Sequence, residues 1–199
     1  MKRNLLFPTP IYMEDLPNAP ELNKDLIKKI KQWRKKEQGI RKTNRGGWHS
    51  PTNMHMKEEF KPLIDELLCM ATGIGAEECY TRPLMLGNMW TNVNYPGCYN
   101  RDHMHSNADW SGVYYVQIPD NCGHLSILDP RHGANMLVPS QKPVKEIPAR
   151  LWKSMNYYPV VGRLIMFPAY LIHGVDINRS KKKGEKGWRI SVSFNFIQK

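Results

Sequence analysis

The second half of the chain is a series of short β-type segments separated by turns, and this pattern limits the possible folds more than any other feature. From Leu84 onward, apolar and β-branched runs alternate with stretches rich in proline, glycine and asparagine. Runs of this length and spacing are typical of an antiparallel sandwich or barrel. The segments read LMLGNMWTNVNY, SGVYYVQIP, HLSILDP, MLVPS, SMNYYPVVGRLIMFP and WRISVSFNF.

The first 80 residues have a helical pattern instead. Apolar side chains recur every three or four positions in residues 18–40 and again in residues 55–75. This periodicity predicts two amphipathic helices. Glycine is a common helix end, so we expect the first helix to end near Gly39 and the second at Gly73 or Gly75.

Length and composition indicate one folded domain. The 199 residues, 41% of them hydrophobic and six of them tryptophan, are enough for one substantial core and exclude a disordered chain. Helices followed by strands favour an α+β fold. We therefore expect a single domain over residues 1–199, in which residues 1–80 are mainly helical support and residues 84–199 form a jelly-roll β core.

The positive charge is concentrated at the two ends of the chain. The net charge is +11, and residues 1–45 and 141–199 are strongly basic, whereas residues 46–140 contain more acidic than basic side chains. This distribution suits an acidic macromolecule as partner or an anionic cosubstrate. A basic surface that only keeps the protein in solution explains it equally well.

The sequence gives some indication of the cellular compartment. No apolar stretch approaches the roughly 18 residues of a membrane span, so no membrane association is expected. Pro8 and Pro10 interrupt the apolar part of the amino terminus, which does not resemble a secretory signal. The four cysteines form no CxxC pair, which favours reduced thiols in a cytoplasmic protein.

Two of the seven histidines stand one residue apart, just before the segment SGVYYVQIP. Residues i and i+2 of an extended segment point to the same side, so His103 and His105 can converge on one metal ion. His173 is the best candidate for a third ligand, because it follows a buried strand and a proline-marked corner. A lone histidine is more often an ordinary hydrogen-bonded or surface residue, and a His-x-His pair alone is a weak motif.

The last β-type segment carries an unusual polar face. Alternation puts the side chains of Ile190, Val192, Phe194 and Phe196 on one face and those of Arg189, Ser191, Ser193 and Asn195 on the other. If this polar face points inward, the arginine needs an anion, because a buried unpaired guanidinium is costly. A carboxylate held by the guanidinium and a serine hydroxyl would meet that need. Alternatively, the face looks at solvent and the arginine is a surface charge.

Several stretches together resemble the 2-oxoglutarate and Fe(II)-dependent oxygenases, in particular small members common in marine bacteria and their phages. The resemblance covers most of the chain, and the similar stretches occur in the same order. They are LFPTPIY, GGWHS, WTNVNYPGCYNRDHMH, SGVYYVQIP, LDPR, GRLIMFPAYLIHGV and RISVSFNF. The resemblance implies a double-stranded β-helix with Fe(II) between its sheets. It also implies dioxygen and 2-oxoglutarate as cosubstrates, hydroxylation of a substrate, and release of succinate and CO2.

The resemblance also implies a role for individual residues. The metal ligands fall on His103, His105 and His173. The arginine that binds the distal carboxylate of 2-oxoglutarate falls on Arg189, with Ser191 beside it. Further cavity contacts are expected by analogy: Asn92 and Tyr95 toward the cosubstrate, Asn94 toward the substrate, and Trp48 with His49 at the entrance.

One departure from the family pattern concerns the metal. The usual set is two histidines and one carboxylate, and here His105 occupies the place of the acid. Asp102 should point away from His103 in an extended strand, and the spacing of Asp109 does not fit the motif. Three neutral imidazoles leave the full charge on the metal until the dianionic cosubstrate binds. Zn or Ni also suits such a site.

Two other classes of function remain open at this stage. A cupin-type metalloenzyme that does not use 2-oxoglutarate would keep the histidines but have no use for Arg189. A non-catalytic basic binding protein would need neither the three histidines nor Arg189. The primary substrate and the oligomeric state are not encoded in any recognisable motif, and the cytoplasm of a bacterium or of a phage-infected host is the expected location.

Overall fold

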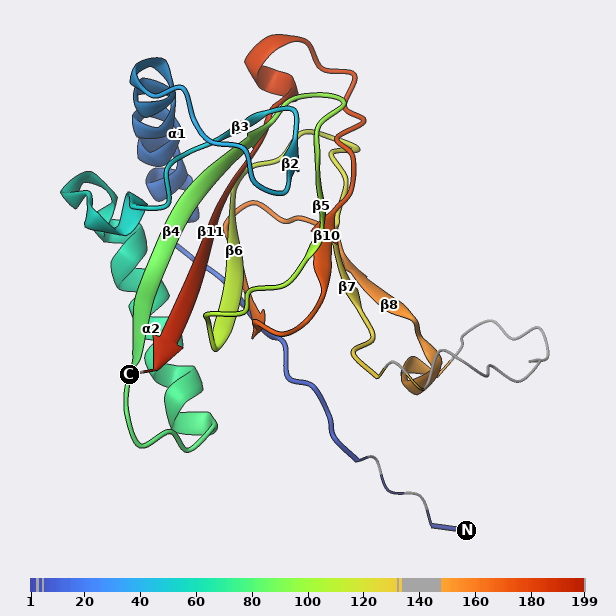
Figure 1. Ribbon diagram of the computed structural model, residues 1–199. Coiled ribbons are helices and arrows are strands. Elements are labelled where there is room, and N and C mark those ends of the chain that lie inside the picture. Colours follow the sequence, from blue (N-terminus) through green and yellow to red (C-terminus); the bar gives the residue numbers. More distant parts are fainter. Residues whose placement is uncertain (3, 5, 132, 134–147, 199) are drawn as a thin grey trace.

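Two antiparallel β-sheets face each other, and two helices cover the outer face of one of them (Figure 1). The computed structural model describes residues 1–199 except 3, 5, 132, 134–147 and 199. The six-stranded sheet has the order β1-β9-β6-β11-β4-β3, and the five-stranded sheet has the order β2-β5-β10-β7-β8. This arrangement is the double-stranded β-helix, or jelly roll, of an α+β chain. The expected strand MLVPS and His132 lie outside the described residues.

The bounds of the elements are as follows. The strands are β1 Tyr12–Asp15, β2 Asn44–Arg45, β3 Trp48–His49, β4 Leu84–Asn94, β5 Tyr99–His103, β6 Trp110–Gln117, β7 Leu125–Leu128, β8 Ser154–Tyr157, β9 Arg163–Pro168, β10 His173–Val175 and β11 Arg189–Gln198. The α-helices are α1 Ala19–Lys36 and α2 Lys61–Glu77. Short 3-10 helices are η1 Met54–Met56, η2 Glu58–Phe60, η4 Ala149–Leu151 and η5 Gly184–Gly187.

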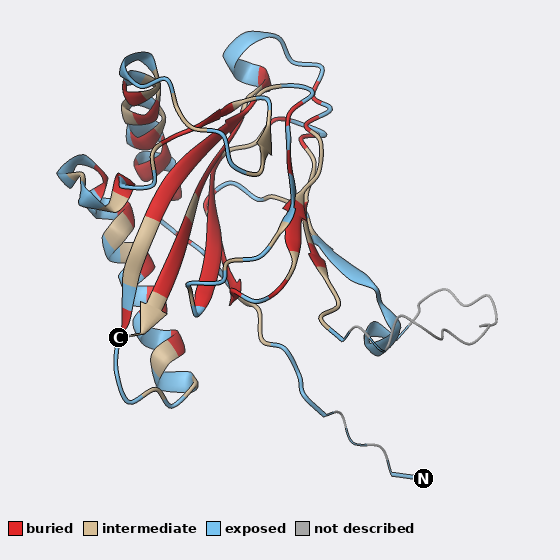
Figure 2. Cartoon of the chain, viewed as in Figure 1, coloured by how far each residue is buried: buried red, intermediate tan, exposed pale blue. Residues whose placement is uncertain are grey.

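The two helices bury their apolar stripes against the six-stranded sheet. Figure 2 shows the buried residues on the sides of α1 and α2 that face the sheet. Leu26 and Ile30 of α1 and Leu67 of α2 are almost completely buried in this core. Burial of each such side chain contributes roughly 2 kcal/mol. None of the helices in the described part of the chain is both long enough and apolar enough to cross a membrane.

Helix α2 does not end where the sequence pattern suggested. It continues through Gly73 and Gly75 to Glu77. A Cβ atom at Gly73 would meet no atom within 4 Å, so this glycine lies on an open side of the helix and interrupts no packing. The backbone turns two residues beyond the helix end, at Cys79, which has a φ of 56°.

The first 80 residues also supply strands. β1 extends the six-stranded sheet by pairing with β9, from Tyr12 opposite Met166 to Asp15 opposite Arg163. β2 and β3 add one short strand to each sheet, beside β5 and β4. Segments of two to four residues are too short to show a period of two, so the alternation that marks a strand was not visible in the sequence.

Alternation along β11 separates the two layers of the molecule, as the sequence predicted. Ile190, Val192 and Phe194 join the core under the helices. Ser191 and Ser193 lie on the opposite face and line a cavity between the two sheets. The inner face of the six-stranded sheet is therefore polar where β4 and β11 meet, and this is where the candidate site lies.

Candidate metal and cosubstrate site

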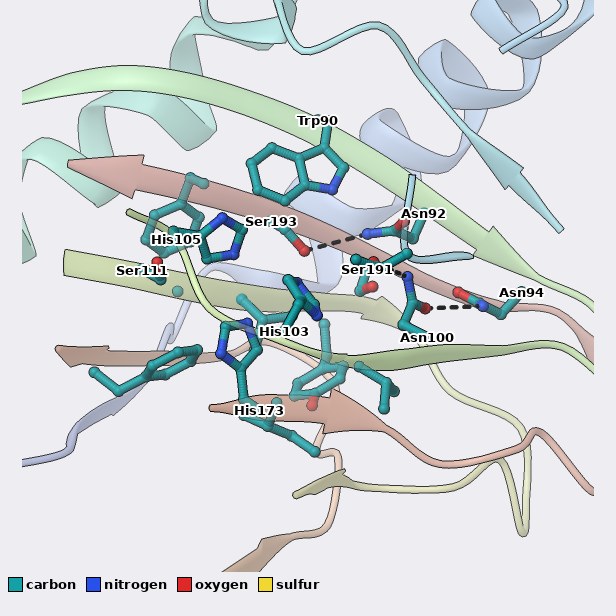
Figure 3. A pocket seen from close by; sticks show the side chains of 18 residues that line it. Trp90, Asn92, Asn94, Asn100, His103, His105, Ser111, His173, Ser191 and Ser193 are labelled. Carbon is teal, nitrogen blue, oxygen red and sulfur yellow. Dashed lines mark hydrogen bonds between the residues drawn. The ribbon is translucent and has the colours of Figure 1, made fainter. Parts of the chain in front are cut away.

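Three histidines meet at one end of the cavity between the sheets. His103 ends β5, His173 begins β10, and their Cα atoms are direct partners in the antiparallel ladder. His105 lies two residues beyond the end of β5. The ring centroids are 4.4 Å apart for His103–His173, 5.0 Å for His103–His105 and 5.2 Å for His105–His173. One nitrogen from each ring lies within 4.8 Å of the others, so the three rings can hold one metal ion (Figure 3).

An irregularity in β5 aims these side chains. His173 and Val175 are two residues apart in β10, but their partners His103 and Asn100 are three apart in β5. The extra residue is a β-bulge, a feature that often re-aims side chains beside an active site. Asn100 and His103 both line the cavity as a result.

The acids next to the histidines stay out of the cluster. The carboxylate of Asp102 lies against Gly174, so close that a Cβ atom on this glycine would be 2.1 Å from Oδ1 of Asp102. Asp109 accepts a hydrogen bond from the backbone N–H of Gln198 at 2.6 Å. Among the described residues, the group of side chains placed to hold a metal consists of the three histidines alone.

Hydrogen bonds orient two of the three rings. Nδ1 of His103 donates to the carbonyl oxygen of Arg101 at 2.7 Å, and Nδ1 of His173 donates to that of Leu171 at 2.8 Å. With Nδ1 protonated, Nε2 is the free nitrogen that can bind a metal.

Burial lowers the pKa of His103, lowers that of His105 to about 4, and lowers that of His173 to about 3. All three rings are neutral at physiological pH, as metal ligands must be.

The lowered pKa values predict that the metal-free protein loses stability in mild acid. Below an ordinary histidine pKa of about 6.5, the unfolded chain takes up protons, while the folded rings of His105 and His173 stay neutral down to about 4 and about 3. Their contribution to stability is therefore complete above pH ~6.5 and is lost as the pH falls toward the folded values. Each group adds a slope of at most about 1.4 kcal/mol per pH unit.

Urea unfolding of the metal-free protein at several pH values between 7 and 4 measures this slope. A His105→Asn variant should show a smaller slope, because it removes one of the groups. An equal slope in both proteins would mean that the imidazole of His105 is not held neutral in the folded state.

A polar wall extends from the histidines along β4 and β11. Asn92 and Asn94 of β4 and Ser191 and Ser193 of β11 line the cavity, together with Asn100. Figure 3 shows the imidazoles toward one end of this wall and the pair Asn94–Asn100, joined by a 3.2 Å hydrogen bond, toward the other. The amide nitrogen of Asn92 donates to the hydroxyl of Ser193 at 3.2 Å, and its oxygen is buried with no partner in the described part of the chain.

Arg189 lies behind the end of the cavity that is farther from the histidines. It is opposite Asn94 in the β4–β11 ladder and is only 1% exposed. Its Nη1 donates to the carbonyl oxygens of Cys122 and Asp176. Nη2 is buried and has no hydrogen-bond partner among the residues that the structure describes. Arg189 does not itself border the cavity, but Tyr115, which interacts with its charge, does.

Tyr95, Trp48 and His49 do not lie where we expected them. Tyr95 is on the face of the sheet opposite Asn94, where it packs against Trp188 and accepts a hydrogen bond from Nε of Arg34 at 2.8 Å. Strand alternation gives the reason, because neighbouring residues point to opposite faces.

The same alternation separates Trp48 from His49. Trp48 packs edge-on against Trp33 in the core under the helices. It is therefore not at an entrance. His49 stacks on Trp90 with the rings 7° from parallel and their centroids 5.6 Å apart. It lies behind a wall of the cavity, because Trp90 lines the cavity directly.

Sequence reasoning missed several residues that line the cavity. Tyr115 and Trp90 both border it, as do Thr43 and Asn100. Strand β6 is buried on both faces, so hydrophobicity alone could not tell which side Tyr115 faces. The pairing of Tyr115 with Ser191 in the β6–β11 ladder does show which side it faces, but this pairing cannot be read from one sequence.

The sequence matches a known family. The model of the family described as "Putative 2OG-Fe(II) oxygenase" matches residues 88–195, more than half of the chain. This range contains the three histidines and Arg189. A search of curated proteins gives no match.

Solved structures with the same fold are similar over most of the chain. A Pseudomonas putida prolyl-4-hydroxylase has a TM-score of 0.67 and 14% identity, over 96% of this chain and 94% of that protein. AviO1 from Streptomyces viridochromogenes has a TM-score of 0.62 and 15% identity, over 96% and 90%. HygX from Streptomyces hygroscopicus, solved with nickel and 2-oxoglutarate, has a TM-score of 0.61 and 11% identity, over 96% and 83%.

At 11–15% sequence identity, the likeness to these solved structures shows only that the fold is shared. The match to the family model is what shows family membership. The fold, the family match and the three convergent histidines agree with one another. The chain belongs to the 2OG-Fe(II) oxygenases, a family of oxidoreductases that use Fe(II), 2-oxoglutarate and dioxygen.

Proposed function

We propose that this protein, with residues 1–199 acting as one catalytic unit, is a dioxygenase that hydroxylates its substrate and converts 2-oxoglutarate to succinate and CO2. One observation carries the proposal. Three imidazoles meet at one end of a cavity, and Arg189, whose Nη2 has no partner among the described residues, is opposite Asn94 toward the other end. These are the groups needed to hold a divalent metal and the far carboxylate of a dicarboxylic acid.

His103, His105 and His173 are the proposed ligands of Fe(II). They come from β5, the loop after it, and β10, and all three line the cavity, so a metal that they held would be reached from the cavity. Bound Fe(II) and 2-oxoglutarate supply the activation of dioxygen. The protein orients the cosubstrate and excludes water from the reacting atoms.

Arg189 and Ser191 are the proposed partners of the distal carboxylate of 2-oxoglutarate. Arg189 and Ser193 are four residues apart in β11, which is roughly 13 Å along a strand. Ser193 is opposite Trp90, near His105. We propose that this span, less the length of the arginine side chain, accommodates a five-carbon dicarboxylate bound to the metal at one end. A carboxylate would also give the unpaired Nη2 a charged partner and offset the cost of burying the guanidinium.

Tyr115 completes this end of the cavity. Burial raises the pKa of its phenol, so the hydroxyl stays protonated and can donate a hydrogen bond. Its Cα atom is directly opposite that of Ser191 in the β6–β11 ladder. Arg189, Ser191 and Tyr115 therefore offer three different donors to one carboxylate.

Asn92 contacts the cosubstrate or the substrate, depending on the orientation of its amide. 2-Oxoglutarate has only acceptor atoms, so Asn92 must present its amide nitrogen to it while its oxygen accepts from the hydroxyl of Ser193. In the opposite orientation, the nitrogen donates to Ser193 and the unpaired oxygen suits an N–H or O–H of the substrate.

Turnover of 2-oxoglutarate tests the proposal. The protein supplied with Fe(II), ascorbate, 2-oxoglutarate and dioxygen should produce succinate slowly even without a primary substrate, with matching dioxygen consumption. N-oxalylglycine, a non-reactive mimic of 2-oxoglutarate, should suppress this reaction and raise the melting temperature of the metal-loaded protein. Absence of succinate together with no thermal shift would exclude the proposed cosubstrate.

A further inference from the structure

The three histidines are not held equally firmly. We propose that His103 and His173 form a fixed metal-binding pair, whereas His105 is an exchangeable third ligand whose departure opens one more coordination position beside Trp90. This inference rests on the proposed function, because it assigns unequal roles within the proposed iron site.

The fixed pair is built into the sheet. His103 and His173 are partners in adjacent strands, so the backbone ladder sets the separation of their Cα atoms. Each ring also donates from Nδ1 to the carbonyl oxygen of the residue two positions earlier, at 2.7 Å and 2.8 Å. Such hydrogen bonds fix both the tautomer and the ring orientation of a metal ligand. β10 lies between β5 and β7, so His173 is also in the interior of its sheet.

His105 lacks both forms of support. It follows the end of β5, in the loop that leads to β6, and its backbone N–H donates to the carbonyl oxygen of Ala169 at 3.1 Å. This bond places the main chain but leaves the side chain free to rotate. Within the described parts of the chain, neither nitrogen of the His105 ring has a hydrogen-bond partner, and neither is among the buried unpaired atoms. The ring is half-buried and its nitrogens reach solvent or the open cavity.

Packing against Trp90 limits the position of the His105 ring but does not fix it. Trp90 lies 5.9 Å from it between ring centroids, with the planes at 52°. His49 stacks on Trp90 and supports the indole. An aromatic contact of this kind limits where the imidazole can lie, but it does not select which nitrogen carries the proton and does not prevent rotation about the side-chain bonds. The His105 side chain is therefore ordered only when it binds the metal, and it regains conformational entropy when it dissociates from the metal.

The consequence for metal affinity can be measured. Outer hydrogen bonds to a ligating histidine typically account for 10- to 100-fold in metal affinity. Loss of His103 or His173 should weaken metal binding by about 100-fold or more, because each removes a preoriented ligand. Loss of His105 should weaken it by about 10-fold or less, because the remaining pair is still intact.

Co(II) titration followed by visible absorption provides the test and does not depend on turnover. The wild type is compared with His103→Ala, His105→Ala, His173→Ala and His105→Asp. We expect the affinity loss of His105→Ala to be at least 10-fold smaller than that of the other two alanine variants. We expect His105→Asp to bind Co(II) at least as tightly as the wild type, because a carboxylate adds charge. Added imidazole should restore the wild-type spectrum of His105→Ala and not that of His103→Ala.

The outcomes separate this inference from the proposed function. Equal losses in the three alanine variants, or no effect of imidazole on His105→Ala, would overturn the exchangeable ligand while leaving a three-histidine metal site. Failure of the wild type to bind Co(II) would instead remove the metal site and the proposed function with it. If His173→Ala does not fold, the comparison of His103→Ala with His105→Ala still decides the question.

Discussion

Replacement of His173 by alanine is expected to reduce both the iron content and succinate formation to background. His173 is 6% exposed, lies in the middle of its sheet and is oriented by the carbonyl oxygen of Leu171. No other described histidine, cysteine or acid is placed to take over as a ligand. The pair that remains, His103 and His105, includes the ring that has no hydrogen bond. Iron content by elemental analysis and succinate by chromatography measure the two effects.

Thermal melts of the metal-free protein must accompany these measurements, because the change also removes a buried ring that packs against Phe167. His55→Ala is a matched control, because His55 lies in η1 near the helices, away from the cavity. A His173→Ala variant that melts like the wild type and still binds iron and forms succinate would exclude His173 as a ligand.

Replacement of Arg189 by methionine should raise the concentration of 2-oxoglutarate needed for half-maximal turnover by about 100-fold. Breaking a buried, hydrogen-bonded charge pair typically costs 2–5 kcal/mol, and about 2.7 kcal/mol corresponds to that factor. Turnover at saturating 2-oxoglutarate should fall much less, because the metal ligands and the open positions are unchanged. Initial rates at varied 2-oxoglutarate separate KM from kcat.

Two further variants make the arginine test specific. Arg189→Lys keeps the charge and loses the planar pair of donors, so its KM should lie between those of the wild type and Arg189→Met. Arg163→Met removes an arginine that pairs with Asp15 at the surface and should leave KM unchanged. Arg189 also donates to the carbonyl oxygens of Cys122 and Asp176, so thermal melts must accompany the kinetics. An unchanged KM in a folded Arg189→Met protein would exclude Arg189 as the partner of the 2-oxoglutarate carboxylate.

Much of the site could be predicted because it depends on strand alternation. Ser191 and Ser193 of β11 and the pair Asn92 and Asn94 of β4 line the cavity, as the period of two requires. The same rule, applied strictly, would have placed Tyr95 on the other face. Its assignment to the cavity came from analogy, and the structure puts it against Trp188.

The rest depends on contacts between distant segments. The bulge in β5 becomes visible only when β10 is aligned beside it, so the sequence could not show why Asn100 and His103 face the same side. The roles of Tyr115 and Trp90 in lining the cavity likewise depend on which strand pairs with which. The absence of a hydrogen bond on the His105 ring is a property of its surroundings in three dimensions, and no motif indicates it.

Anaerobic titration of the Fe(II)-loaded protein with 2-oxoglutarate tests the central claim most directly. Chelation of Fe(II) by the keto acid produces a visible charge-transfer band. We expect this band to appear in the wild type and to saturate with added 2-oxoglutarate. In Arg189→Met it should require far more 2-oxoglutarate, and in His173→Ala it should be absent. A wild type that binds Fe(II) but develops no band, or a band that persists unchanged in His173→Ala, would contradict the account.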